Sequence, residues 1–127
     1  DDAVGLNETI KGIISDIEKE NVEFEYDMSE IIPNNIKYCF AAITKEAIAN
    51  IIKHSNATSV KITLREHPAL YQLCIEDDGK GYNPEEGDTT GIGLKNMQER
   101  VQMLGGTFQI RGDNGFRIFI TIPKKQD

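Results

Sequence analysis

The segment from Lys45 to His54 carries four polar side chains of different chemistry at helical spacing. At about 100° per residue they fall on one face of a helix, and they are Glu46, Asn50, Lys53 and His54. A carboxylate can orient a water, an amide oxygen suits Mg²⁺, and a lysine can meet phosphate charge. The pattern favours a site for a metal-bound polyphosphate. An ordinary amphipathic helix with a polar outer side explains this segment alone equally well.

A second group of residues follows a predicted strand, in the order Asp77-Asp78-Gly79-Lys80-Gly81. A carboxylate at a strand end can accept a hydrogen bond from an exocyclic amine, such as that of adenine. The two glycines let the backbone approach a flat ring closely. The alternative is a tight turn, because Asp-Gly is a common turn dipeptide.

A third group, Gly91-Ile92-Gly93-Leu94, directly precedes a predicted helix. Unpaired amides at a helix N-terminus, reached through glycines, bind phosphate oxygens readily. A flexible helix entry is the alternative, since a lone Gly-x-Gly is a weak signal. In chain order, however, the three groups supply contacts for a metal, a base and phosphates, and their combination is more specific than any one of them.

Length and composition set the outer limits. The 127 residues suit one domain, and the formal net charge of −7 argues against a general nucleic-acid binder. Cys39 and Cys74 lie in apolar runs, which predicts two reduced, buried thiols and no metal cluster. No stretch has the length of a membrane span or the pattern of a signal peptide. The chain opens at Asp1 without Met, so we expect a fragment of a longer protein.

These motifs need elements to position them, and apolar periodicity supplies the prediction. Helices are expected over 5–20, 35–54 and 94–104, and strands over 22–27, 59–66, 70–76, 107–111 and 116–122. A loop of about 17 residues, 77–93, is long enough to be functional. On the central helix, the predicted buried side comprises Phe40, Ala41, Ala47, Ile48, Ile51 and Ile52.

The three motifs resemble the N, G1 and G2 boxes of the ATP-binding domain of bacterial sensor histidine kinases. This domain belongs to the HATPase or GHKL superfamily, which includes gyrase, Hsp90 and MutL. The N-box pattern Glu46-x-x-x-Asn50-x-x-Lys53-His54, followed by Ser55-Asn56-Ala57, is similar to the NarL/DesK-type subgroup. Asp77-x-Gly79-x-Gly81 matches G1, and Gly91-Ile92-Gly93-Leu94 matches G2. The likeness covers nearly the whole of residues 1–127 as one domain.

The resemblance implies a two-layer α/β sandwich of the Bergerat type, with a mixed sheet packed on about three helices. MgATP would lie between the helices under a lid over about 82–90. Asn50 would ligate Mg²⁺, Glu46 would act as the base-like residue, and Asp77 would accept from the adenine amine. The other implied contacts are Lys53 and His54 to the phosphates, Gly79 and Gly81 along the base, and Gly91, Gly93 and Leu94 along the phosphates.

The implied function is transfer of the γ-phosphate of ATP to a histidine on a separate dimerisation domain, and onward to a response regulator. That histidine, and any sensor domain, are absent from this chain. The resemblance further implies a cytoplasmic domain of a membrane-anchored kinase, monomeric in isolation and homodimeric at full length, with no nucleic-acid or membrane contact of its own. One departure is Phe116, which follows Gly115 where the family often has Thr.

Two alternatives remain open from the sequence. One keeps the fold and makes the chain a protein-serine kinase of the anti-sigma-factor type, against which the Lys53-His54 pair argues. The other is a non-catalytic regulatory module that binds nucleotide or a partner protein, and Phe116 is the feature that favours it.

Overall fold

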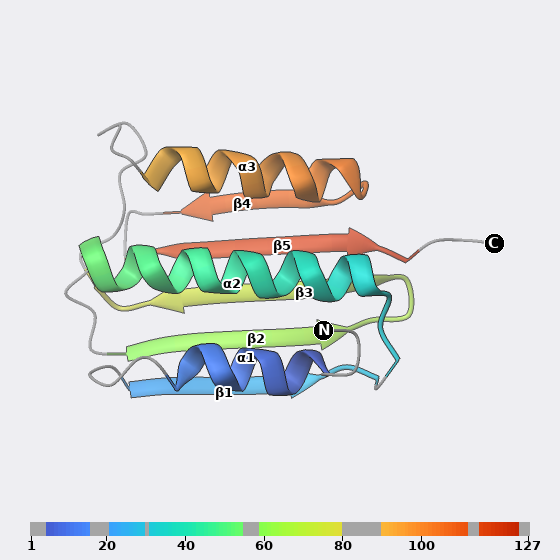
Figure 1. The fold of residues 1–127 in the computed structure, drawn as a ribbon, viewed down its shortest axis with the longest axis horizontal. Helices are drawn as coiled ribbons and strands as arrows, with labels where there is room; N and C mark the ends of the chain where they lie inside the picture. The colour runs from blue at the N-terminus through green and yellow to red at the C-terminus, as the bar shows by residue number, and fades with distance from the viewer. Residues whose placement is uncertain are drawn as a thin grey trace.

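Segments with alternating apolar and polar residues assemble into one five-stranded mixed sheet (Figure 1). The computed structural model describes residues 5–15, 21–29, 31–54, 59–79, 90–111 and 115–124. The strands are β1 (Asn21–Asp27), β2 (Ser59–Glu66), β3 (Leu70–Asp77), β4 (Thr107–Arg111) and β5 (Arg117–Pro123), in the order β1-β2-β3-β5-β4. Only the β1–β2 pair within the described strands is parallel.

Three helices, α1 (Leu6–Ile14), α2 (Asn34–His54) and α3 (Thr90–Met103), form a second layer in front of the sheet in Figure 1. The central helix α2 contacts both α1 and α3. Apolar side chains of α2, such as Phe40 and Ile43, meet Ile75 and Ile118 from the sheet in one buried cluster. The predicted two-layer α/β sandwich is confirmed. None of the three described helices is long and apolar enough to cross a membrane.

Most predicted elements lie within one residue of those observed, and two differ in a way that matters for the site. Strand β3 extends one residue further than expected and includes Asp77. Helix α3 begins at Thr90, not at Leu94, so the predicted loop and lid end earlier than expected. The first helix ends at Ile14, and residues 16–20 lie outside the described ranges.

The buried side of α2 is rotated from the one predicted. Ile52, expected in the core, is 53% exposed, whereas Ile36 and Ile43 on the predicted polar side are only 4% and 1% exposed. Ile36 and Ile43 belong to the buried cluster that also contains Ile75 and Ile118 of the sheet, while Ile52 lies at the far edge of the predicted apolar arc. The same rotation buries Asn50.

Both cysteines are free and buried, as predicted. Burial raises the pKa of the Cys39 thiol to about 11, and burial also raises the pKa of Cys74. Since the thiolate is the reactive form, neither side chain is suited to nucleophilic chemistry near neutral pH.

An ion pair fastens the sheet at the end remote from the predicted nucleotide contacts. Glu66 Oε2 lies 2.6 Å from Lys124 Nζ, and Glu66 Oε1 accepts the Ser29 N–H at 2.7 Å. The hydrogen bond from Lys124, followed by that from Ser29, lowers the pKa of Glu66 from 4.5 to about 2. Lys124 Nζ also lies 5.3 Å from the centre of the Tyr71 ring.

This contact predicts a pH-dependent contribution to stability. Because the folded-state pKa of Glu66 is depressed, the contribution is full above pH 4.5 and is lost as pH falls toward 2. Lys124→Met should therefore lower the melting temperature at neutral pH, and the difference from the parent should vanish near pH 2 in thermal melts. Arg65→Met, which removes an exposed contact to Glu25 at 3.4 Å, is the control and should change little. A Lys124→Met deficit that persists unchanged at low pH would contradict this assignment.

Candidate functional site

The three predicted motifs meet at one end of the molecule. The C-terminal half of α2, the end of β3 and the start of α3 all lie on the left in Figure 1. They come together because α2 and β3 both end, and α3 begins, at this end of the sheet. Segments more than 40 residues apart in sequence, such as those of Glu46 and Gly93, therefore share one site.

Two of the motifs approach each other closely where Glu46 meets Gly93. A Cβ atom built on Gly93 would lie 2.6 Å from Glu46 Cδ and 2.7 Å from Glu46 Oε1. The Glu46 carboxylate therefore rests directly on the backbone of α3, in a space that only glycine leaves open. Any side chain at position 93 has to displace this carboxylate. The N-box and G2-like motifs are thus in contact at Glu46 and Gly93.

The sequence predicts the G2-like motif directly before the helix. In the structure the motif instead forms the first turn of α3. Gly91 and Gly93 lie within this turn, with Thr90 as the first helical residue. The first N–H groups of a helix have no partner within the helix, and the helix dipole favours negative charge there. The first turn of α3 contains no acidic residue. With the corrected boundary, the predicted phosphate contacts of this motif would be made by amides of the first helical turn.

Asn50 lies one turn beyond Glu46 on α2 and is 5% exposed. Its Nδ2 atom is buried and makes no hydrogen bond within the described part of the chain. A buried amide nitrogen without a partner costs stability. This nitrogen is a donor and does not ligate metals, whereas the carboxamide oxygen of the same side chain, which is not among the buried unpartnered atoms, is a hard ligand of the type that Mg²⁺ prefers.

Asp77 is the last residue of β3 and is 8% exposed. Its Oδ1 accepts the Gly79 N–H at 2.7 Å, and its own N–H donates to the Phe116 carbonyl at 2.9 Å. The neighbouring Asp78 is turned toward β2, where its Oδ1 accepts the Ser59 N–H at 2.9 Å. The two adjacent carboxylates therefore differ, since one is buried at the strand end and the other ties β3 to β2.

The contact of Gly115 with Asp77 is not predicted by the sequence. Gly115 has a φ of +83°, and a Cβ there would fall on the carbonyl oxygen of Asp77. The sequence offered only a glycine in the closing hairpin, which a turn explains by itself. Its position against Asp77 depends on the pairing of β3 with β5.

Several predicted contacts are not tested by the described residues. Gly81 and residues 82–89 of the predicted lid lie outside them, as do the side chains of Lys53, His54 and Leu94. The backbones of Lys53 and His54 belong to α2, and those of Gly91 and Leu94 belong to α3. The roles assigned to these residues stay predictions.

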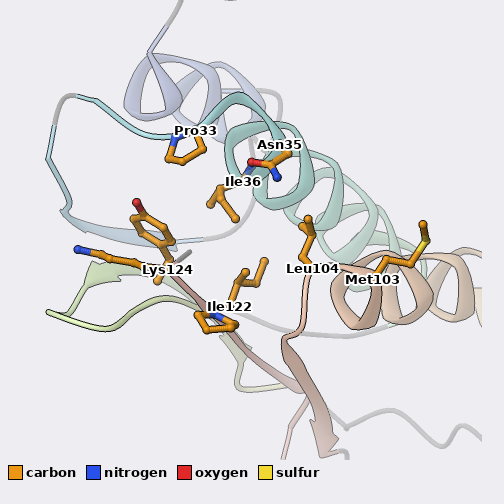
Figure 2. Close-up of a pocket in the computed structure, with 9 residues that line it drawn as sticks. Pro33, Asn35, Ile36, Met103, Leu104, Ile122 and Lys124 are labelled. Atoms are coloured by element: carbon orange, nitrogen blue, oxygen red, sulfur yellow. The ribbon is translucent and has the colours of Figure 1, made fainter. Parts of the chain in front are cut away.

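A separate cavity of about 430 Å³ lies at the opposite end of the molecule (Figure 2). Ile36 from the start of α2, Leu104 just after α3 and Ile122 near the end of β5 form its apolar walls. None of its lining residues is among the predicted nucleotide contacts. The cavity is therefore distinct from the candidate site.

The solved structures similar to this chain are histidine kinases. The structure of the Acinetobacter baumannii histidine kinase AdeS matches with a TM-score of 0.78 at 20% identity, covering 96% of this chain and 66% of that one. The ATP binding domain of PrrB from Mycobacterium tuberculosis matches with a TM-score of 0.68 at 20% identity, covering 97% of this chain and 96% of that one. At such identities the likeness establishes the fold.

The sequence relatives are sensor proteins. The chain is 36% identical over 126 residues to the sensor protein VraS of Staphylococcus haemolyticus, and 35% identical over 126 residues to VraS of Staphylococcus aureus. In both cases 96% of this chain is covered but only 36% of the relative, so the chain spans about a third of their length. These matches do not test the narrower likeness to NarL/DesK-type kinases, which stays a prediction.

The family model for histidine kinase-, DNA gyrase B- and HSP90-like ATPases matches residues 40–126. This range contains all three motifs and the elements that bring Glu46, Asn50, Asp77 and Gly93 to one end of the sheet. The chain belongs to this family of ATPases.

Proposed function

We propose that this chain is the catalytic domain of a longer sensor kinase. It binds MgATP and donates the γ-phosphate to a histidine on a separate dimerisation domain, for onward transfer to a response regulator. The observation that carries the proposal is the contact of the Glu46 carboxylate with the first turn of α3 at Gly93, beside the buried Asn50. A carboxylate, a carboxamide and the backbone amides of a helix N-terminus at one point suit the reacting end of a nucleoside triphosphate.

Each residue has a distinct part in this proposal. Asn50 holds Mg²⁺ through its carboxamide oxygen, and the metal neutralises phosphate charge when bound. The described residues contain no cluster of three histidine, cysteine or acidic side chains, so the remaining ligands would be nucleotide phosphates and water, as is usual for Mg²⁺. Gly91, Gly93 and Leu94 contribute backbone amides to the phosphates, and Lys53 and His54 contribute positive charge.

Glu46 orients the accepting imidazole or a water, and Asp77 accepts from the adenine amine while Gly79 and Gly81 line the base. Catalysis in phosphoryl transfer is mainly positioning and charge stabilisation, so the chain alone should turn over slowly without its acceptor.

The partners follow from the same proposal. The acceptor histidine belongs to a dimerisation domain of the same protein, and the response regulator receives the phosphoryl group from it. The isolated domain is monomeric and the whole kinase is a homodimer. The domain works on the cytoplasmic side of a membrane-anchored protein.

The test is MgATP titration by calorimetry, followed by transfer of labelled phosphate to a dimerisation domain supplied as a separate protein. We expect saturable binding at or below roughly millimolar nucleotide and an acid-labile, alkali-stable phosphoprotein. Glu46→Gln should bind MgATP but transfer phosphate poorly, whereas Glu99→Gln on the exposed side of α3 should match the parent. A folded parent that binds no MgATP refutes the proposal.

The same experiment separates the alternatives. An acid-stable phosphoprotein indicates a serine kinase of the anti-sigma-factor type. Binding without transfer to the dimerisation domain indicates the non-catalytic regulatory module. The observation favouring that module is Phe116, which is 3% exposed and belongs to the buried apolar cluster beside Asp77, where a hydroxyl would otherwise be available.

A further inference from the structure

We infer that Gly115 is a positioning residue for recognition of the nucleotide base, acting through Asp77. By lying directly against the Asp77 backbone, it sets where the Asp77 carboxylate points and so how sharply an amine is distinguished from a carbonyl on the base. The inference rests on the proposed function, in which Asp77 accepts from the adenine amine.

The conformation of Gly115 is one that other residues rarely adopt. Its φ of +83° lies in the left-handed region, where a side chain introduces strain. A Cβ would also overlap the Asp77 carbonyl oxygen and lie 3.2 Å from the Asp77 carbonyl carbon. Because these are backbone atoms, they cannot turn aside as a side chain can. A substitution has to move the end of β3 itself.

Phe116, the residue after Gly115, also contacts the Asp77 backbone. The Phe116 carbonyl accepts the Asp77 N–H at 2.9 Å, one step beyond the last paired residues of β3 and β5, Glu76 and Arg117. Phe116 is 3% exposed and continues the alternation of buried residues at Ile118 and Ile120. Asp77 continues the buried alternation of β3 in the same way, so both side chains face the helix layer.

The Asp77 carboxylate is therefore built on a backbone that has little freedom. Gly115 limits it on the carbonyl side, Phe116 fixes its N–H, and the Gly79 N–H holds Oδ1 at 2.7 Å. A fixed acceptor favours a ligand amine and leaves a ligand carbonyl facing a carboxylate, which is unfavourable. If the backbone shifts, the carboxylate can adapt and this discrimination weakens.

The experiment compares the affinities of ATP and inosine triphosphate (ITP), which carries a carbonyl in place of the adenine amine. Both are titrated with Mg²⁺ into the 127-residue parent and Gly115→Ala. We expect the ratio of ATP to ITP affinity to fall about tenfold in Gly115→Ala, with the gain from Mg²⁺ retained. General loss of stability would lower both affinities together and leave the ratio unchanged.

Two glycines at the other end of the sheet provide matched controls. Gly105 has a similar φ of +77°, but a Cβ built there would have a Pro123 side-chain atom as its nearest neighbour, at 3.6 Å. Gly106 reproduces the backbone overlap, because a Cβ there would meet the Thr121 carbonyl oxygen. Gly105→Ala and Gly106→Ala should lose stability and keep the parental ratio.

Each outcome points to one claim. A parent that binds no ATP refutes the proposed function, and a folded Gly115→Ala with the parental ratio overturns the inference alone. If Gly115→Ala does not fold in thermal melts, Gly115→Asn takes its place, because asparagine adopts a positive φ more readily than alanine and still places a Cβ against the Asp77 backbone. A threefold or larger fall in the ratio supports the inference, and an unchanged ratio overturns it.

Discussion

Asp77→Asn is expected to weaken ATP binding about 100-fold, with the fold intact. The buried carboxylate is replaced by an amide, which removes the charge-assisted hydrogen bond that we propose Asp77 makes to the adenine amine. The side-chain oxygen that accepts the Gly79 N–H is still available in asparagine, so the turn after β3 is retained. Thermal melts should therefore change little while calorimetry shows the loss.

The neighbouring carboxylate gives a matched control for this experiment. Asp78 is exposed and its Oδ1 accepts the Ser59 N–H, a contact that Asp78→Asn can keep. Asp78→Asn should bind ATP as the parent does, although it makes the same change of charge one residue away. Equal loss in both variants would show that net charge governs binding and that Asp77 has no specific role.

Asn50→Leu is expected to remove the Mg²⁺ dependence of ATP binding without lowering stability. The parent should bind ATP more tightly with Mg²⁺ than with a chelator, and the variant should bind equally under both conditions. The buried Nδ2 atom has no hydrogen bond within the described residues, so replacing the amide by a similarly sized apolar group removes a cost. A melting temperature equal to or above that of the parent is therefore expected.

Thr44 allows the stability part of this prediction to be checked independently. It is a second buried polar residue of α2, but its Oγ1 donates to the Phe40 carbonyl at 2.8 Å. Thr44→Val should lose this bond and about 1 kcal/mol of the free energy of unfolding, and it should therefore melt at a lower temperature. Its Mg²⁺ dependence of ATP binding should match that of the parent. If Asn50→Leu instead retains the Mg²⁺ effect, the metal is held elsewhere and the role of Asn50 is wrong.

Thr44 and Asn50, two buried polar residues of α2, differ in whether their side chains are hydrogen-bonded. Thr44 is buried and satisfied, whereas Asn50 is buried with its amide nitrogen unpartnered in the described structure. Natural proteins tolerate such losses mainly where function needs the group. This contrast along one helix supports a functional reading of Asn50 without reference to any relative.

Much of the fold could be predicted from local patterns. Alternation over 59–66 and 107–111 placed two strands at their observed bounds, because side chains on a half-buried strand point alternately to the core and to water. The N-box spacing placed Glu46 and Asn50 on one face of α2 for the same kind of reason, since residues four apart are neighbours on a helix. Element type and motif order were therefore determined locally.

Other features depended on which elements pack together. The exposure of Ile52 and the burial of Ile36, Ile43 and Asn50 follow from which side of α2 faces the rest of the fold, and the sequence of α2 alone does not contain this information. The start of α3 at Thr90 was missed because glycines disfavour helix interiors, a local preference that tertiary packing overrides.

The sequence by itself determined the chemistry available to this protein: a carboxylate and an amide at helical spacing, a strand-end aspartate, and glycines at a helix start. Only the tertiary structure decided that Glu46 rests on Gly93 and that Gly115 rests on Asp77. Both contacts join segments more than 35 residues apart, and both exist because glycine has no side chain. At Gly93 this lets a carboxylate reach the backbone, and at Gly115 it lets two backbone segments touch. The residues next to a glycine in sequence do not show which distant segment packs against it. Glycine is required at these positions because another segment occupies the space that a side chain would fill.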